Sequence, residues 1–364
     1  MGKTSMRGMI SGVVLCLCAS LPALADEPQA KRSPGAPTVW KGVHLESPGH
    51  EGVPLLKRAI EEGLAPLGVN VLVLEVNYRY AFKSHPELAD PDGLTLEDVR
   101  ALLAVCRAHK IRLIPQFNCL GHQSWESYTF PLLTKYPELD ETPAAPRDNK
   151  GLYCRSWCPL HPKTNPIVFA LIDELAEAFE ADAFHAGMDE VFLIASPECP
   201  RCKGKDPAEV FARTVNDLHK HLVGEKKLTM LMWGDRLIDG AKTHYGKWEG
   251  SENGTAPAID HIPKDIILCD WHYEVRTSYP SVHTFQEKGF RVWPSSWKNK
   301  EAALAFLDDA HRDSSDRMLG QLCTTWIGAE SLCRALVGEG QPAKEAEADQ
   351  VIAALRACME KLGR

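Results

Sequence analysis

Two adjacent carboxylates, Asp189 and Glu190, follow a short apolar run that begins at Ala183. The run has the length of one buried strand, and neighbouring residues of a strand point to opposite faces. Both acids can serve one site only where the strand ends, and we expect that end to lie between them. Glycine at position 187 would let a ligand or a second backbone segment come close. Paired acids in one site indicate proton-transfer chemistry, whereas two solvated acids at a strand end are the structural alternative.

Polar and aromatic side chains recur at the ends of the other apolar runs. They are Glu75, Asn118, His122, Trp233, Asp235, Trp271, Tyr273, Trp297 and Trp326. One such residue would be uninformative, because a single tryptophan or histidine is usually part of a core. Tryptophan at the ends of four successive runs is a pattern. Aromatic faces suit the C–H faces of sugar rings, and the polar groups supply hydrogen bonds to hydroxyls, so the pattern indicates a carbohydrate site.

The elements that must position these residues are short strands alternating with helices, an arrangement typical of βα units and a parallel sheet. The predicted strands are 39–46, 69–77, 112–118, 183–190, 228–236, 265–273, 291–297 and 318–326. Predicted helices are 54–65, 96–109, 166–180, 207–223, 281–288 and 301–312, with a closing helix at 343–361. Eight units without a repeated glycine-rich dinucleotide fingerprint favour an α/β fold of one domain over 39–364, a (β/α)8 TIM barrel. Its active sites lie at the carboxyl ends of the strands.

The first 25 residues have the features of a secretory signal peptide. Lys3 and Arg7 precede an apolar run at 9–21, and small residues at 23 and 25 form a cleavage site before Asp26. Residues 26–38, rich in proline, alanine and charge, are predicted to be a disordered lead-in. No later run approaches the roughly 18 apolar residues of a membrane span. We expect a secreted or periplasmic protein without stable membrane insertion.

Charge and cysteine usage limit the possible partners and cross-links. Lys and Arg number 41 against 49 Asp and Glu, evenly scattered, so no basic patch indicates nucleic acid. Cys199 and Cys202 form a Cys-x-x-Cys pair that could join Cys154 and Cys158 in a four-thiolate zinc site. An oxidising compartment favours local disulfides, and free thiols are the third possibility. These alternatives stay open, as does the oligomeric state.

Several of these residues resemble the motifs of one enzyme family. The segment 185–190, His-Ala-Gly-Met-Asp-Glu, resembles the His-x-Gly-Gly-Asp-Glu signature of family 20 glycoside hydrolases, the β-N-acetylhexosaminidases. Ile114-Pro115 with Gly121-His122 is similar to the family's third-strand Pro…Gly-His element. Trp233, Asp235, Trp271 and Trp326 fall where the family has pocket residues. The likeness covers roughly 39–337, and we expect the chain to lack the separate α/β domain that many members carry before the barrel.

The resemblance implies hydrolysis of a terminal β-linked N-acetylhexosamine, GlcNAc or GalNAc, with retention of configuration. Glu190 would be the general acid, and the substrate's own acetamido oxygen the nucleophile, giving an oxazolinium-like intermediate. Asp189 would hold the acetamido N–H, and Tyr273 its carbonyl. The remaining expected contacts with the glycan are Glu75, Asn118, His122, Trp233, Asp235, Trp271, Trp297 and Trp326. No metal or organic cofactor is implied.

Three departures separate the chain from the family pattern. The first-strand arginine that grips sugar hydroxyls in many members has no match in the segment 41–46, Lys-Gly-Val-His-Leu-Glu. Met188 replaces the second glycine of the signature, and Gly328 falls where a Trp-x-Glu acid is common. The acid pair is intact, whereas recognition of the outer hydroxyls must differ.

Two alternative functions follow from these departures. One is a glycan-binding barrel with weak or no catalysis, which the missing arginine suggests. The other is a two-carboxylate glycosidase acting on non-acetylated sugars, which needs a second acid about 5–9.5 Å from Glu190. Glu46, Glu75 and Asp235 are the candidates for that acid. The preference between GlcNAc and GalNAc and the natural polymer stay open.

Overall fold

The computed structural model describes residues 1–2, 39–312, 315–339 and 346–363. Most of the predicted signal peptide and the whole predicted lead-in, 26–38, lie outside the described residues. Both therefore stay predictions.

Eight parallel strands close into a barrel in the order β1-β10-β9-β8-β7-β6-β3-β2. They are β1 (Trp40–Glu46), β2 (Val71–Glu75), β3 (Arg112–Cys119), β6 (Ala183–Gly187), β7 (Thr229–Trp233), β8 (Ile267–Trp271), β9 (Arg291–Ser296) and β10 (Gly320–Cys323). Each coincides with a predicted strand, and the predicted (β/α)8 TIM barrel is confirmed. The order follows the chain because each crossover returns the next strand to its predecessor's side. A small antiparallel hairpin, β4 (Ser124–Trp125) and β5 (Tyr128–Thr129), lies in the connection after β3.

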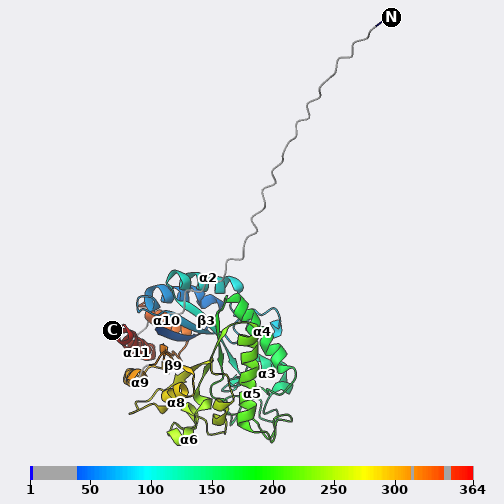
Figure 1. Cartoon of the computed structure of the whole chain (residues 1–364), viewed down its shortest axis with the longest axis vertical. Coiled ribbons are helices and arrows are strands. Elements are labelled where there is room, and N and C mark those ends of the chain that lie inside the picture. Colours follow the sequence, from blue (N-terminus) through cyan, green and yellow to red (C-terminus); the bar gives the residue numbers. More distant parts are fainter. Residues whose placement is uncertain (3–38, 313–314, 340–345, 364) are drawn as a thin grey trace. The chain divides into compact units, whose positions relative to one another are not determined.

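Helices cover the outside of the barrel, and α2, α4, α5, α8 and α9 surround the strands in Figure 1. The predicted helices correspond to α1 (Val53–Arg58) with a π-helical continuation at Ala59–Leu64, α2 (Leu96–Ala108), α4 (Thr164–Ala178), α5 (Pro207–His219), α8 (Pro280–Glu287), α9 (Lys300–Arg312) and α11 (Ala346–Leu362). Sequence reasoning missed α10 (Ala329–Leu336) and the short helices α3 (Pro131–Lys135), α6 (Gly240–Thr243) and α7 (Gly246–Glu249). Residues 343–345 of the predicted closing helix lie outside the described part.

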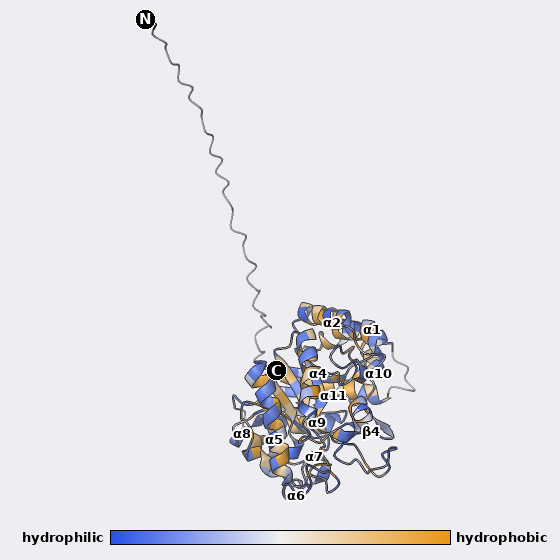
Figure 2. Cartoon of the chain, turned by 90° about the vertical axis from the view of Figure 1, so that its right-hand side faces the viewer, coloured by the Kyte–Doolittle hydropathy of each residue, from blue (hydrophilic) through white to orange (hydrophobic). Residues whose placement is uncertain are grey.

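The helices pack on the barrel with one apolar face. Helix α5 begins at Pro207 after the N-cap Asp206, whose side chain accepts two backbone N–H bonds, and it buries Val210, Phe211 and Val215. Figure 2 shows hydrophilic and hydrophobic residues mixed along α2 and α5, as this amphipathic packing requires. None of the helices in the described ranges is both long and apolar enough for a membrane crossing.

A separate layer of side chains fills the barrel interior. It consists of Trp40, Val71, Val73, Ile114, Ala183, Leu231, Trp233, Ile267, Cys269, Trp271, Trp293 and Leu322. Trp233 and Trp271, the last residues of β7 and β8, belong to this layer and lie at its carboxyl end. The interior packing thus supports the rings that the sequence assigned to a sugar site.

Candidate active site

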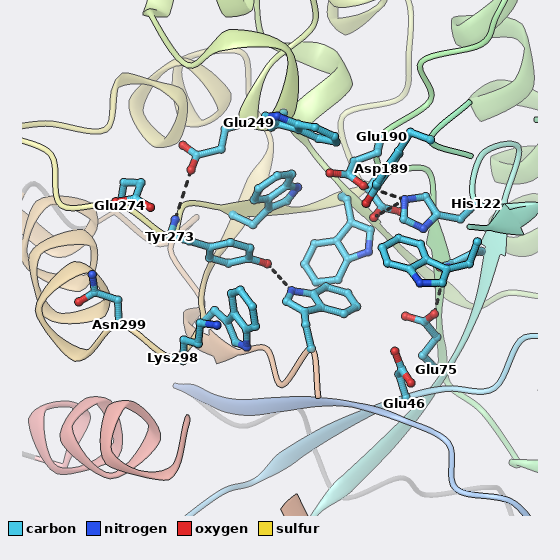
Figure 3. A pocket seen from close by; sticks show the side chains of 18 of the residues that line it. Glu46, Glu75, His122, Asp189, Glu190, Glu249, Tyr273, Glu274, Lys298 and Asn299 are labelled. Carbon is cyan, nitrogen blue, oxygen red and sulfur yellow. Dashed lines mark hydrogen bonds and ion pairs between the residues drawn. The ribbon is translucent and has the colours of Figure 1, made fainter. Parts of the chain in front are cut away.

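A cavity of about 1500 Å³ opens at the carboxyl ends of the barrel strands. The predicted site residues that line it are Glu75, Asn118, His122, Asp189, Glu190, Trp233, Trp271, Tyr273, Trp297 and Trp326 (Figure 3). Asp235 does not line the cavity and is only 2% exposed. The barrel therefore brings the predicted residues together at one rim, with Asp235 behind it.

The acid pair is aimed by a left-handed turn of the backbone. Strand β6 ends at Gly187, before the pair, so the expectation that it ends between the two acids is wrong. Gly187, Met188 and Glu190 have φ values of +67°, +76° and +47°. This conformation breaks the strand alternation and lets both carboxylates line one cavity. It costs an ordinary side chain about 1–2 kcal/mol per residue, and such strain is concentrated at functional sites.

Glycine is required at position 187 for a second reason. A Cβ atom there would lie 2.6 Å from Asn118 Oδ1 and 2.8 Å from Asn118 Cα. The close approach of a second backbone segment that the sequence predicted at this glycine is confirmed, and the segment is strand β3. The contact brings Asn118 alongside the turn that carries the acids.

His122 holds the two acids from one side. Its Nε2 lies 3.1 Å from Glu190 Oε2 and 3.4 Å from Asp189 Oδ2 (Figure 3). Burial opposes a charge on His122, but the two carboxylates outweigh it and raise the histidine pKa well above its ordinary value. Burial, with the charges of Asp235 and Glu190, raises the pKa of Asp189 to about 7 against the opposing effect of His122. The buried site therefore favours the protonated form of Asp189 up to about neutral pH.

One ligand atom from each of His122, Asp189 and Glu190 lies within 4.8 Å of the others, a spacing that a metal ion could bridge. Metal binding needs a neutral imidazole. Because the carboxylates raise the pKa of His122, the geometry favours a proton at this position.

Asp235 supports the acid pair from behind the cavity wall. Its Oδ2 accepts the backbone N–H of Glu190 at 3.0 Å and Arg236 Nε at 2.6 Å, and its Oδ1 accepts Trp271 Nε1 at 3.3 Å. Arg236 is fully buried and also donates to three backbone carbonyls in the loop after β7. Sequence reasoning placed Asp235 on the glycan, whereas its contacts position Glu190 and Trp271.

Glu75, at the end of β2, is surrounded by donors. Asn77 Nδ2 and Asn118 Nδ2 reach its Oε1 at 2.8 and 2.9 Å, and Gln116 Nε2 reaches Oε2 at 2.9 Å. His44 Nε2 lies 3.1 Å from the same Oε2. Although burial acts in the opposite direction, these partners, His44 foremost, lower the pKa of Glu75. Glu75 is a fully engaged carboxylate that orients Asn118.

The end of β1 is acidic, at the place where the resemblance leads one to look for an arginine. Glu46 lines the cavity, and burial together with the charge of Glu75 raises its pKa. Arg79, in the loop after β2, also lines the cavity and donates to the backbone carbonyl of Ser47 at 2.7 Å. An arginine is therefore present near this wall, supplied by a different loop.

Aromatic rings form the wall across from the acid pair. Trp326 Nε1 donates to the hydroxyl of Tyr273 at 2.5 Å. The centroid of Tyr273 lies 5.0 Å from that of Trp271 and 5.6 Å from that of Trp297, and Trp233 lies 5.9 Å from Trp326. Trp233, Trp271 and Trp326, which the sequence assigned to a sugar site, all line this one cavity. Figure 3 shows the Tyr273 hydroxyl at this wall, away from Asp189 and Glu190.

A second aromatic group, which sequence reasoning missed, lies beside Glu190. Tyr153 packs edge-on against Trp248, Trp125 and Phe192, with centroids 4.9, 5.4 and 5.6 Å away. Trp125 and Trp248 line the cavity and are 48% and 41% exposed. These residues come from the connections that follow β3, β6 and β7 rather than from the ends of the barrel strands. The available signal was the concentration of aromatic residues in the long connection after β3, a kind of loop that is usually functional.

Comparison with known proteins decides the family. The family model described as "Glycosyl hydrolase family 20, catalytic domain" matches residues 75–329, which include the acid pair and the wall of tryptophans. The chain belongs to glycosyl hydrolase family 20. A β-hexosaminidase of Emericella nidulans is 26% identical over 216 residues, which cover 55% of this chain and 32% of that protein. A β-hexosaminidase of Vibrio furnissii is 24% identical over 201 residues, which cover 55% of this chain and 29% of that protein. The chain spans about a third of the length of these relatives.

Solved structures show the same fold. The chitobiase of Flavobacterium johnsoniae superposes with a TM-score of 0.60 at 20% identity, covering 89% of this chain and 52% of the chitobiase. Dispersin B superposes with a TM-score of 0.53 at 15% identity, covering 89% of this chain and 99% of Dispersin B. The match spans nearly the whole of the Dispersin B chain.

Proposed function

We propose that this protein hydrolyses terminal β-linked N-acetylhexosamine residues, GlcNAc or GalNAc, from a glycan by the retaining, substrate-assisted mechanism. The observation that carries the proposal is the convergence of Asp189 and Glu190 on His122, across from an aromatic wall that includes the Tyr273 hydroxyl. The predicted signal peptide, residues 1–25, supports action outside the cytoplasm, in the periplasm or the medium.

Each group has one task in this mechanism. Glu190 protonates the glycosidic oxygen as the bond to the sugar C1 breaks, and the acetamido oxygen of the same sugar attacks C1. Asp189 accepts the acetamido N–H and stabilises the positive charge of the oxazolinium-like intermediate, while Tyr273 donates to the acetamido oxygen. Water then attacks C1 from the side the leaving group vacated, the bond between C1 and the acetamido oxygen breaks, and the Glu190 carboxylate takes the proton of that water.

The contacts of the other acids argue against a two-carboxylate mechanism. Asp235 is held by Arg236 Nε and the Glu190 N–H and does not line the cavity. The Glu75 carboxylate accepts three hydrogen bonds from side-chain amides and lies beside His44. Glu46 lines the cavity and has no such side-chain hydrogen bond within the described part of the chain; burial and the charge of Glu75 raise its pKa, which disfavours a nucleophilic carboxylate. The strained turn at Glu190 likewise argues against a barrel that has lost catalysis.

The aromatic group beside Glu190 supports a glycan as the leaving group. Because Glu190 protonates the oxygen that departs, the leaving group must extend from the acid toward Tyr153. Trp125 and Trp248 are exposed there and offer faces on which a second sugar can stack. A small aglycone would need no such surface.

The test compares matched substrates with the purified mature protein. Aryl β-N-acetylglucosaminide and aryl β-N-acetylgalactosaminide should be cleaved, and the aryl β-glucoside, which lacks the internal nucleophile, should be cleaved poorly. Efficient cleavage of the glucoside, or a covalent sugar–protein adduct, would contradict the substrate-assisted mechanism. Binding of the sugars without hydrolysis of any of them would favour the glycan-binding barrel.

A further inference from the structure

Three cysteine thiols and one carboxylate form a buried cluster that the proposed reaction does not use. One ligand atom from each of Glu141, Cys158, Cys199 and Cys202 lies within 4.8 Å of the others, and all four residues are buried. Cys158 Sγ lies 3.4 Å from Cys199 Sγ and 3.5 Å from Cys202 Sγ. Glu141 and Cys158 belong to the connection between β3 and α4, whereas the two other cysteines follow the acid pair.

The carboxylate is the second observation that points to a ligand. Glu141 is 0% exposed, and its Oε1 accepts the backbone N–H of Ser196 at 2.8 Å. Its Oε2 is buried and accepts no hydrogen bond from an N–H or O–H group of the described residues. A buried carboxylate oxygen without such a donor is costly, and here it lies among three sulfur atoms. A cation at the centre of the cluster would satisfy it.

The sulfur separations fit a shared metal ion better than a disulfide. Zinc–sulfur bonds of about 2.3 Å in a tetrahedron separate neighbouring sulfurs by about 3.8 Å, whereas a disulfide requires about 2.05 Å. The observed 3.4 and 3.5 Å are much nearer to the tetrahedral value than to the disulfide length. Cys158 is also nearly equidistant from both partners. A disulfide with either one would leave a buried thiol and the carboxylate without a partner.

We propose that Glu141, Cys158, Cys199 and Cys202 bind one zinc ion in a tetrahedral structural site. Three thiolates and one carboxylate oxygen provide the four ligands, and the thiol protons pass to solvent on binding. The site differs from the four-thiolate site that the sequence suggested. Cys154 is directed elsewhere, with its Sγ 3.7 Å from the backbone carbonyl oxygen of Glu190.

The ion would fasten two loops that build the acid side of the cavity. The first loop carries Tyr153 and Cys154 between its two ligands, and Cys154 contacts the Glu190 backbone. The second loop begins directly after Glu190 and reaches its ligands at Cys199 and Cys202. Zinc bound here therefore stabilises the position of the acid pair without contacting substrate. The inference rests on the cluster alone and not on the proposed function.

The experiment measures metal in the full mature chain, expressed with zinc and purified with a reductant. Elemental analysis should find one zinc per chain. After chelation and reconstitution with Co²⁺, the thiolate-to-cobalt and tetrahedral ligand-field bands should appear at one equivalent. Alkylation followed by mass spectrometry should find Cys158, Cys199 and Cys202 protected with metal and reactive without it.

Matched variants separate this site from the four-thiolate site. Glu141→Ala and Cys199→Ser should lose stoichiometric zinc, whereas Cys154→Ser should keep one zinc per chain. Loss of zinc in Cys154→Ser with retention in Glu141→Ala would overturn the ligand assignment. Absence of zinc and cobalt binding by the wild type, or a disulfide at Cys158 that persists when zinc is supplied, would overturn the site. If a variant fails to fold, the wild-type cobalt spectrum and thiol protection still decide.

Discussion

Replacing Asp189 with asparagine should stabilise the folded protein at neutral and alkaline pH. Burial and neighbouring acids raise the pKa of Asp189 from 3.8 to about 7. The folded chain then holds a proton that the unfolded chain has released, so the free energy of unfolding falls as the pH rises from about 4 to about 7. Asparagine has the shape of the protonated acid and carries no charge, so the variant avoids this loss.

The size of the effect follows from the shift. Each pKa unit is worth about 1.4 kcal/mol, which sets a ceiling of about 4 kcal/mol above pH 7. Because His122 contacts Asp189 and readjusts its own proton when Asp189 ionises, we expect about half of that ceiling, about 2 kcal/mol. For a chain of this size, such a gain corresponds to a rise of about 3 °C in the unfolding midpoint.

Thermal unfolding of the wild type and Asp189→Asn at pH 8 and pH 4.5 measures the effect. The variant should unfold at the higher temperature at pH 8, and the difference should nearly vanish at pH 4.5. Glu252→Gln, which changes an exposed carboxylate, should leave the midpoint unchanged at both pH values. If Asp189→Asn destabilised the protein equally at both pH values, the claim that the folded chain raises the pKa of Asp189 would be refuted.

Three further substitutions test the supporting contacts. Asp235→Asn should lower the free energy of unfolding by about 3 kcal/mol, because it leaves the buried Arg236 guanidinium without its carboxylate. A decrease of less than about 1 kcal/mol, measured by urea unfolding, would contradict the ion pair between Asp235 and Arg236. Gly187→Ala should lower the free energy of unfolding by well over the roughly 1–2 kcal/mol that a left-handed backbone alone costs, because the added methyl group also collides with Asn118 of β3. Gly68 is also left-handed but has no atom within 4 Å of the added methyl group, so Gly68→Ala should lower it by only that amount. Trp326→Phe removes the indole N–H from the hydroxyl assigned to the acetamido oxygen, so kcat/KM on acetamido substrates should fall about tenfold; an unchanged value would refute that role.

The barrel and its rim could be predicted because strand periodicity is local and parallel strands converge. Glu75, Asn118 and Trp233 each stand at or next to the end of an apolar run, and closure of eight strands carries those ends to one cavity. The position of the acid pair at this rim could be predicted by the same rule. The backbone conformation that aims the two acids could not, because the left-handed turn from Gly187 onward depends on the approach of Asn118 from another strand.

Loop residues could not be placed from their positions in the chain. Tyr153 and Trp248 are far apart in sequence and meet only because two long loops fold over the acid side. Glu141 lies in an ordinary polar stretch, so nothing local distinguishes it from a surface acid until the fold buries it beside the cysteines. Asp235 follows a strand end by two residues, but the turn at Asp235–Leu237 directs it behind the wall.

The most direct test of the proposed mechanism is the hydrolysis rate of Glu190→Gln on two N-acetylglucosaminides that differ in leaving group. Removal of the general acid should lower kcat by about 10²–10⁴ on a sugar leaving group, which must be protonated to depart. The loss should be much smaller for a nitrophenyl leaving group, whereas Asp189→Asn should impair both substrates alike. Full activity of Glu190→Gln on the sugar leaving group would contradict the assignment of Glu190 as the proton donor and, with it, the mechanism proposed here.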